Sequence, residues 1–225
     1  MPVDPSRTVA ELVIERPSRT RVFERHGVDY CCGGKRTLAQ ACARRGVDAS
    51  AVVAELELEA AAGTGAPDGV DWSGAPLAEL CDHIVDTHHE FLRAELPRLS
   101  AMVDKVARVH GAERPEMPVV RDVFEAMRAE LEAHLVDEEE RLFPACRAGA
   151  PIDSGDLEGL EAEHVTVGAA LERIRDLTGG HDMSAAMCNT HRATLDGLRE
   201  LEADLHLHIH LENNVLFPRV VAGAA

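Results

Sequence analysis

The chain has 225 residues, of which 40 are Asp or Glu and 23 are Lys or Arg, and its formal net charge is −17. A chain this acidic has no general attraction for nucleic acid or anionic lipid, so both are excluded as expected partners. The first residues lack a basic segment followed by an apolar run, and no apolar stretch reaches about eighteen residues, which predicts a cytoplasmic protein. Its six cysteines are therefore expected to be thiols and not a disulfide framework.

The first part of the chain predicts short helices separated by turn residues. Capping residues precede the helices, and Pro or Gly ends most of them. We expect helices over residues 8–16, 18–26, 37–45 and 48–62. The segment GTGAPDGVDWSGAP is rich in Gly, Pro and Asp and is interpreted as a linker. The predicted division is an N-terminal helical domain at 1–62, a linker at 63–76 and a second domain at 77–225.

Four longer segments with helical periodicity follow the linker. Gly or Pro occurs in their connections, and no convincing alternation of a strand is found. The segments cover residues 77–108, 117–143, 154–177 and 184–217. The predicted fold class is therefore all-α, with the four segments forming an antiparallel four-helix bundle.

A motif occurs twice in the predicted bundle, as HLVDEEERLFP from His134 and as HIHLENNVLFP from His208. On a wheel of about 3.6 residues per turn, His134 and Glu138 lie in the middle of an apolar stripe. His208 and Glu212 occupy the same place on the fourth helix. Both pairs are expected to face the core. The Phe-Pro that ends each copy is interpreted as a packing residue followed by a helix stop.

The other two helices also bring histidine to the core. His164 is central on the stripe of the third helix. In the first helix the periodicity favours His88, with His89 at the edge of the stripe. The internal repeat favours His89, because 75 residues separate it from His164 and 74 separate His134 from His208. The residues alone leave this choice open.

Buried carboxylates and histidines in this arrangement indicate a metal pair. An isolated buried charge costs many kcal/mol, and no Arg or Lys lies on the same stripes, so a cation must come from outside. If Glu138 and Glu212 each bridge two ions, two histidines per ion and a bridging oxo or hydroxo group leave one position open on each. Imidazole and carboxylate ligands suit iron, manganese or zinc, and two iron ions are expected. The alternative is a metal-free interaction module with packed histidines.

The segment VDYCCGG places Cys31 and Cys32 next to each other. Lys35 and Arg36 follow, with a helix expected from Thr37, and a thiol in such surroundings has a lowered pKa. The flanking glycines are expected to leave both sulfurs accessible. We interpret the pair as candidate redox or iron-transfer thiols. The alternative is a pair of small buried residues at a turn.

The remaining candidates receive weaker interpretations. Glu130 and Glu163 lie near the expected ligands and are candidates to orient an imidazole. The run DEEER is interpreted as solvated surface except for Glu138, and His206 and His210 lie off the stripe of the fourth helix. Surface positions are expected for His26, His110, His181 and His191. Core filler or spare thiols are expected at Cys42, Cys81, Cys146 and Cys188.

DYCCGG at 29–34, together with HLVDEEERLFP and HIHLENNVLFP, resembles the iron–sulfur cluster repair di-iron protein family, known as RIC, YtfE or ScdA. The resemblance covers nearly the whole chain and implies a small ScdA-like cysteine domain followed by a hemerythrin-like four-helix bundle. The family pattern has a histidine eight residues before the Pro of Leu96-Pro97, which selects His89 over His88. The di-iron ligands implied by the resemblance are His89, His134, Glu138, His164, His208 and Glu212.

The resemblance implies repair of iron–sulfur clusters damaged by nitrosative or oxidative stress, by donation of iron from a labile di-iron centre. The implied partners are proteins with damaged clusters, with NO or O2 as small ligands. The alternative is an O2- or NO-binding hemerythrin-like sensor, or a di-iron enzyme that reacts with NO. The cysteine pair counts against a simple carrier, and whether the protein turns over a substrate stays open.

Overall fold

The computed structural model describes residues 3–62 and 71–223. Their regular structure is helical, apart from an isolated bridge between Thr8 and Thr37, which confirms the all-α prediction. Across these ranges every helix is too short or too polar to span a bilayer. Residues 63–70 of the expected 63–76 linker lie outside the described residues.

The chain divides into two compact units. One contains residues up to Leu80 together with those from His206 on, and the other contains Cys81–Leu205. Helix α10, Asn189–Leu211, therefore passes from the second unit into the first. The predicted domain division at 62 and 77 stays a prediction.

The N-terminal helices begin and end where the sequence places caps. Thr8 and Thr37 each form a reciprocal capping box, with Glu11 and Gln40 three residues on. Gly27 ends its helix in the left-handed conformation at φ 61°, which glycine adopts without steric cost. The elements are α1 Val9–Glu15, the 3-10 turn η1 Pro17–Arg19, α2 Thr20–His26, α3 Leu38–Arg45 and α4 Ala49–Ala62.

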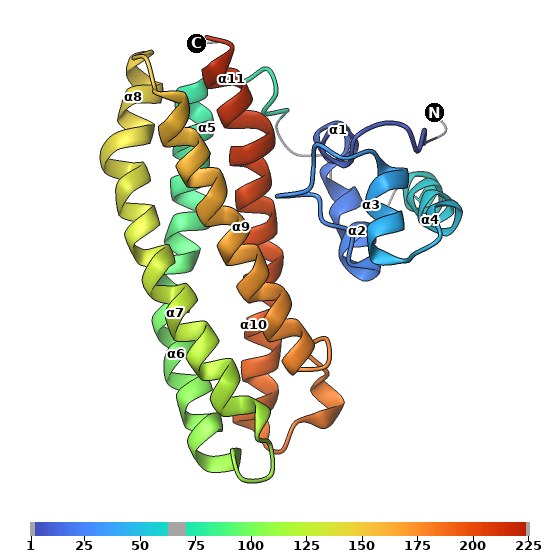
Figure 1. Ribbon diagram of the computed structural model, residues 1–225, viewed down its shortest axis with the longest axis vertical. Helices are drawn as coiled ribbons and strands as arrows, with labels where there is room; N and C mark the ends of the chain where they lie inside the picture. Colours follow the sequence, from blue (N-terminus) through green and yellow to red (C-terminus); the bar gives the residue numbers. More distant parts are fainter. Residues whose placement is uncertain (1–2, 63–70, 224–225) are drawn as a thin grey trace. The chain divides into compact units, whose positions relative to one another are not determined.

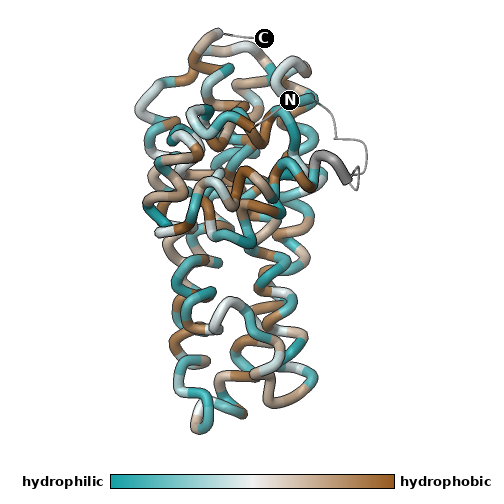
Figure 2. Tube along the Cα trace, turned by 90° about the vertical axis from the view of Figure 1, so that its right-hand side faces the viewer, coloured by the Kyte–Doolittle hydropathy of each residue, from teal (hydrophilic) through white to brown (hydrophobic). Residues whose placement is uncertain are grey.

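Four long helical rods follow, and successive rods run in opposite directions (Figure 1). Hydrophobic and hydrophilic residues alternate along them (Figure 2), as expected for helices with one buried face. The first rod is α5 Leu77–His83, η2 Ile84–His89 and α6 Glu90–His110, and the second is α7 Glu116–Asp137, η3 Glu138–Leu142 and α8 Phe143–Ala148. The third is α9 Ser154–Leu177, followed by the turn η4 Met183–Ala185, and the fourth is α10, η5 Glu212–Leu216 and α11 Phe217–Val221.

The segments η2, η3 and η5 are single π-helical stretches inside the rods. Their wider turns are closed by backbone bonds to the fifth residue back, from Glu90 to Val85, from Phe143 to Glu138 and from Phe217 to Glu212. Such π-turns are uncommon in helices and concentrate at functional sites. Each of the three begins or ends at a predicted metal ligand.

The expected helix stop at each Phe-Pro is wrong. Pro144 lies in the first turn of α8, which continues to Ala148, and Pro218 lies in the first turn of α11. Proline has no N–H, and in an α-helix its ring meets the carbonyl four residues back. In the preceding π-turn the backbone hydrogen bond runs to the fifth residue back instead of the fourth, so the rod continues past the proline.

Candidate metal centre

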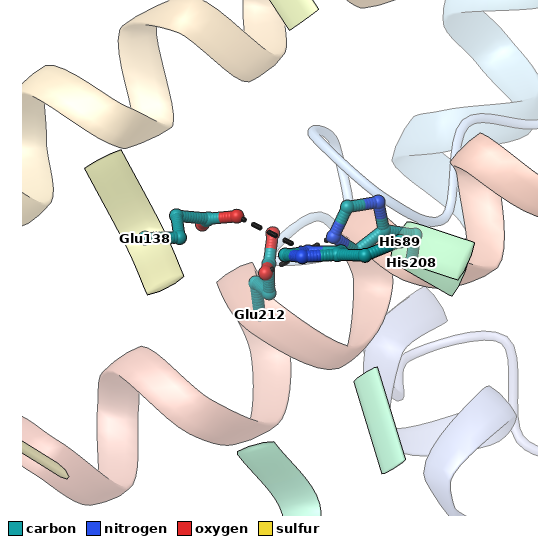
Figure 3. A group of neighbouring side chains, drawn as sticks. All are labelled: His89, Glu138, His208 and Glu212. Carbon is teal, nitrogen blue, oxygen red and sulfur yellow. Dashed lines mark hydrogen bonds and ion pairs between the residues drawn. The ribbon is translucent and has the colours of Figure 1, made fainter. Parts of the chain in front are cut away.

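Six buried side chains from the four rods form two overlapping groups with metal-ligand chemistry. In each group one donor atom per residue lies within 4.8 Å of all the others, and Glu138 and Glu212 belong to both groups. Figure 3 shows the first group, whose imidazoles and carboxylates point toward one another. The groups are His89, Glu138, His208 and Glu212, and His134, Glu138, His164 and Glu212.

Glu138 reaches toward one histidine with each carboxylate oxygen. Its Oε2 lies 3.4 Å from His89 Nε2, and its Oε1 lies 3.3 Å from His134 Nε2. The far nitrogens of these rings bind other carboxylates, since His89 Nδ1 lies 2.6 Å from Glu139 and His134 Nδ1 lies 2.7 Å from Glu163. A carboxylate on Nδ1 fixes the ring and leaves Nε2 to bind a metal.

The remaining histidines also direct Nε2 into the cluster. His164 Nε2 lies 3.1 Å from His134 Nε2, and His208 Nε2 lies 3.1 Å from Glu212 Oε1. Imidazole nitrogens that converge on each other are the arrangement expected when both bind one cation. The donor atoms, four imidazole nitrogens and two carboxylates, are therefore arranged for a pair of ions.

The fit to cations rests on the surroundings of Glu138. Its side chain is fully buried, and among the described residues neither of its oxygens receives a hydrogen bond. A buried carboxylate in this state is costly unless a cation binds it. Imidazole and carboxylate donors suit iron, manganese or zinc and do not single out one of them.

The structure brings together all six predicted ligand positions, and the ligand roles themselves stay a prediction. His88, which periodicity favoured, belongs to neither group and instead places Nδ1 2.8 Å from Asp204. The π-turn η2 ends at His89 and changes the register that a regular wheel assumes. Both His88 and His89 are buried, so burial alone could not have separated them.

Of the three carboxylates discussed near the ligands, one agrees with the prediction and two do not. Glu163 contacts His134 as predicted, whereas Glu130 is exposed and does not orient a ligand. Glu139 was expected to be solvated surface, and this is wrong, because it binds both His89 and Arg93. Hydrogen bonds from these two side chains lower the pKa of Glu139 despite partial burial. No sequence signal could have found Glu139, because in a regular helix the residue after Glu138 turns away from the buried stripe.

The cysteine pair is less accessible than its glycines suggest. Cys31 is buried and Cys32 is half-buried, and their sulfurs lie 3.8 Å apart. The hydrogen bond to Cys32, burial and the nearby Asp29 raise the pKa of the Cys31 thiol. The expected lowered pKa and accessible sulfur are therefore wrong for Cys31.

The backbone of the cysteine segment contacts the helix that carries two predicted ligands. His210 Nδ1 donates to the carbonyl of Tyr30 at 3.1 Å, and Asn214 donates to the carbonyl of Cys31 at 2.9 Å, all within the unit that contains both ends of the chain. Burial lowers the pKa of His210 to about 4, so the ring is neutral near pH 7. His210 lies off the stripe because it faces this segment.

Comparison with known proteins agrees with both parts of the chain. Residues 82–220 match the family described as the hemerythrin HHE cation binding domain, and residues 5–60 match the ScdA_N family, described as a domain of unknown function (DUF542). Proteins named "Iron-sulfur cluster repair protein YtfE" from Escherichia coli O1:K1 / APEC, Citrobacter koseri and Escherichia fergusonii are each 39% identical over 217 residues. Each match covers 96% of this chain and 96% of the relative.

The chain belongs to the YtfE iron–sulfur cluster repair family. Its two overlapping metal-binding groups lie within the region that matches the hemerythrin cation-binding domain. The cysteine pair lies within the region that matches ScdA_N. The predicted resemblance is thereby confirmed over both regions.

Proposed function

We propose that this protein repairs iron–sulfur clusters damaged by nitrosative or oxidative stress, acting in the cytoplasm by supplying iron to the damaged client. The observation that supports it most is Glu138, a buried carboxylate without a hydrogen bond among the described residues, placed between two histidines. The printed name of the relatives, iron–sulfur cluster repair protein, supports the same function.

The resident metals in this proposal are two iron ions held by the six residues of the two groups, with an oxo or hydroxo bridge. When bound, the pair supplies exchangeable iron and an open position for NO or O2. Glu139 and Glu163 hold the His89 and His134 rings in the orientation that ligation requires. The domains we assign are the cysteine domain at 1–62, the linker at 63–76 and the hemerythrin-like bundle at 77–225.

The donor set supports release of iron as well as binding. With the oxo or hydroxo bridge, the two carboxylates and four neutral imidazoles would bring three or four negative charges to the buried pair, fewer than the six positive charges of two trivalent ions. Excess positive charge in a buried site is costly and weakens retention. A centre of this composition therefore suits iron donation better than permanent storage.

In the same proposal the cysteine pair acts as redox or iron-transfer thiols toward the client. Cys32 is the better placed of the two, because it is half-buried whereas Cys31 is buried and has a raised pKa. Cys31 can then hold the proton of the pair, since its sulfur donates toward Cys32 at 3.8 Å. The clients are proteins that carry damaged clusters.

The test is transfer of labelled iron. The protein is loaded with 57Fe and mixed with a [4Fe–4S] hydro-lyase inactivated by NO, and both the recovered activity and the 57Fe in the client are measured. We expect both to rise with the wild type and with Glu140→Gln, an exposed neighbour, and to fail with Glu138→Gln. Binding of NO by the loaded protein without any iron transfer would contradict repair and favour the sensor function.

A further inference from the structure

Cys188 caps the helix α10 with its sulfur. It directly precedes the helix, and its carbonyl accepts the first intrahelical bond, from Arg192 at 2.9 Å. Its Sγ accepts the backbone N–H of His191 at 3.4 Å, which is the position of a capping side chain. The positive end of a helix dipole favours a negative charge on this sulfur.

A histidine from another helix also contacts the same sulfur. His110, at the end of α6, places Nε2 3.3 Å from Cys188 Sγ. His191 stacks against His110 at a ring separation of 6.3 Å, and its Nδ1 accepts the N–H of Met187 at 3.2 Å. The bonds from the His191 backbone and the His110 side chain lower the pKa of the Cys188 thiol. Cys188 and His110 thus have the geometry of a thiol activated by an imidazole.

The other charged groups at this end of the bundle carry both signs. Arg114 lies in the connection after α6, and Glu116 opens α7. The two side chains lie 3.5 Å apart, and Arg114 also binds the carbonyl of Ala185. Burial, and then the positive charge of Arg114, lower the pKa of His191. Of the two stacked rings, the one that contacts the sulfur is that of His110.

Cys188 differs from every other cysteine in the chain. All six cysteines lie within the described residues, and it is the exposed one. The thiol pKa is raised at Cys31, Cys42 and Cys81, where burial contributes, and it is lowered at Cys146, which is buried, and at Cys188. Low pKa combined with access is what distinguishes a reactive thiol from a structural one.

A pocket of about 240 Å³ lies beside the cap, with Arg114, Glu116, Asp176, Asp182 and His191 on its wall. This volume is below the roughly 300–1,000 Å³ of clefts that hold drug-sized ligands, which limits the ligand to a small molecule. The charged residues of this wall are one arginine and three carboxylates, which suits a zwitterion whose carboxylate meets Arg114 and whose ammonium group meets the acidic side chains. Amino-acid thiols and their disulfides have this character and this size.

We propose that Cys188 is a reversible S-thiolation site that exchanges with small zwitterionic disulfides. The Cys188 thiolate attacks one sulfur of the disulfide, a new S–S bond forms, and the second sulfur leaves as a thiolate with the electron pair of the broken bond. The protein thiol is oxidised, and the released half of the disulfide is reduced. His110 is a positioning residue that stabilises the attacking thiolate.

The first test is the pH dependence of alkylation in the metal-loaded protein, with iodoacetamide and mass spectrometry of each cysteine peptide. We expect alkylation of Cys188 to reach half its maximal rate at a pH below about 8.5, the pKa of a free thiol. In guanidinium-unfolded protein, the half-maximal rate of the same peptide should return to about pH 8.5. His110→Ala should slow alkylation near pH 7 by about 3–10-fold, up to one pKa unit. Val109→Ala, at the exposed neighbouring position, should leave the rate unchanged.

The second test uses cystine as the disulfide. A cysteine adduct should form first on Cys188, be removed by dithiothreitol, and form more slowly in His110→Ala than in Val109→Ala. If the pH of half-maximal alkylation at Cys188 is equal in folded and unfolded protein, the proposal is overturned. This comparison needs no variant. First reaction at Cys32 would also overturn it.

Discussion

Glu138 connects the two histidines whose rings are themselves held by carboxylates. One of its oxygens lies near His89 and the other near His134, and neither receives a hydrogen bond among the described residues. A carboxylate in this position could give one oxygen to each of two ions. A bound cation would offset the cost of burying its charge.

Replacing Glu138 with Gln should remove both ions, because this residue belongs to both groups. The metal-free variant should be more stable than the metal-free wild type by about 1–2 kcal/mol, since a neutral amide costs less to bury than a carboxylate that receives no hydrogen bond. Elemental analysis and urea unfolding measure the two effects. Glu140→Gln, an exposed neighbour, serves as the control. Metal content equal to that of the wild type would exclude Glu138 as a shared ligand.

Replacing Glu163 with Gln should weaken metal binding without abolishing it. The side chain holds His134 at 2.7 Å and belongs to neither metal-binding group, and loss of such a partner costs roughly 10–100-fold in affinity. Competition with a chelator measures the change, and Glu158→Gln on the exposed face of α9 is the control. If both variants bind equally well, the carboxylate does not orient the ring.

At the scale of single residues, periodicity predicted the buried His and Glu positions that lie four residues apart on one helix. A regular helical wheel was enough to place His134 and Glu138, and their counterparts in the last helix, on a buried face. The wheel did not predict His89, because the π-turn that ends there changes the helical register and no residue type predicts a π-turn. Glu139 was missed for the same reason, since a regular helix would turn it toward solvent.

At the scale of elements, the three π-turns lie where the ligands lie. The bond from Phe143 to Glu138 and the bond from Phe217 to Glu212 each connect a ligand backbone to the residue before a proline. Because the motif occurs twice, a π-turn precedes the proline in both the second and the fourth rod. Short helices were predicted well, since caps such as Thr8 and stops such as Gly27 act locally.

The helix end at Gly27 offers a stability test that is independent of metal. Gly27→Ala should destabilise the protein by roughly 1–2 kcal/mol, because alanine is strained at φ 61°. Gly159→Ala is the matched substitution inside α9, where an added Cβ meets no atom within 4 Å. It should stabilise by about 0.5–1 kcal/mol. Urea unfolding followed by circular dichroism measures both, and effects of the same sign would contradict this explanation of the helix end.

At the scale of the whole molecule, the sequence predicted two parts, but it could not predict that the compact unit of the N-terminal residues also includes His206 and the residues after it. The hydrogen bonds from the side chains of His210 and Asn214 to backbone carbonyls of the cysteine segment connect distant parts of the chain, which periodicity within one helix does not reveal. They place the segment on the helix of two predicted ligands.

The cysteine pair should be needed for repair and dispensable for metal binding. The double variant Cys31→Ser/Cys32→Ser should lose repair of an NO-damaged client while its metal content and visible spectrum stay unchanged, because no cysteine belongs to either metal-binding group. Cys188→Ser, which removes a thiol elsewhere, should repair as the wild type does. Full repair by the double variant would exclude these thiols from iron transfer.

The most direct measurement of the central claim is metal content per chain, together with the visible absorption spectrum, for protein purified in the presence of iron. We expect about two irons per chain with oxo-bridge charge-transfer bands. Both should be lost in the His134→Ala/His208→Ala double variant, which removes one histidine from each group. A fully helical wild-type protein that binds no metal would show that these buried histidines and glutamates are structural, and would contradict the repair function proposed from them.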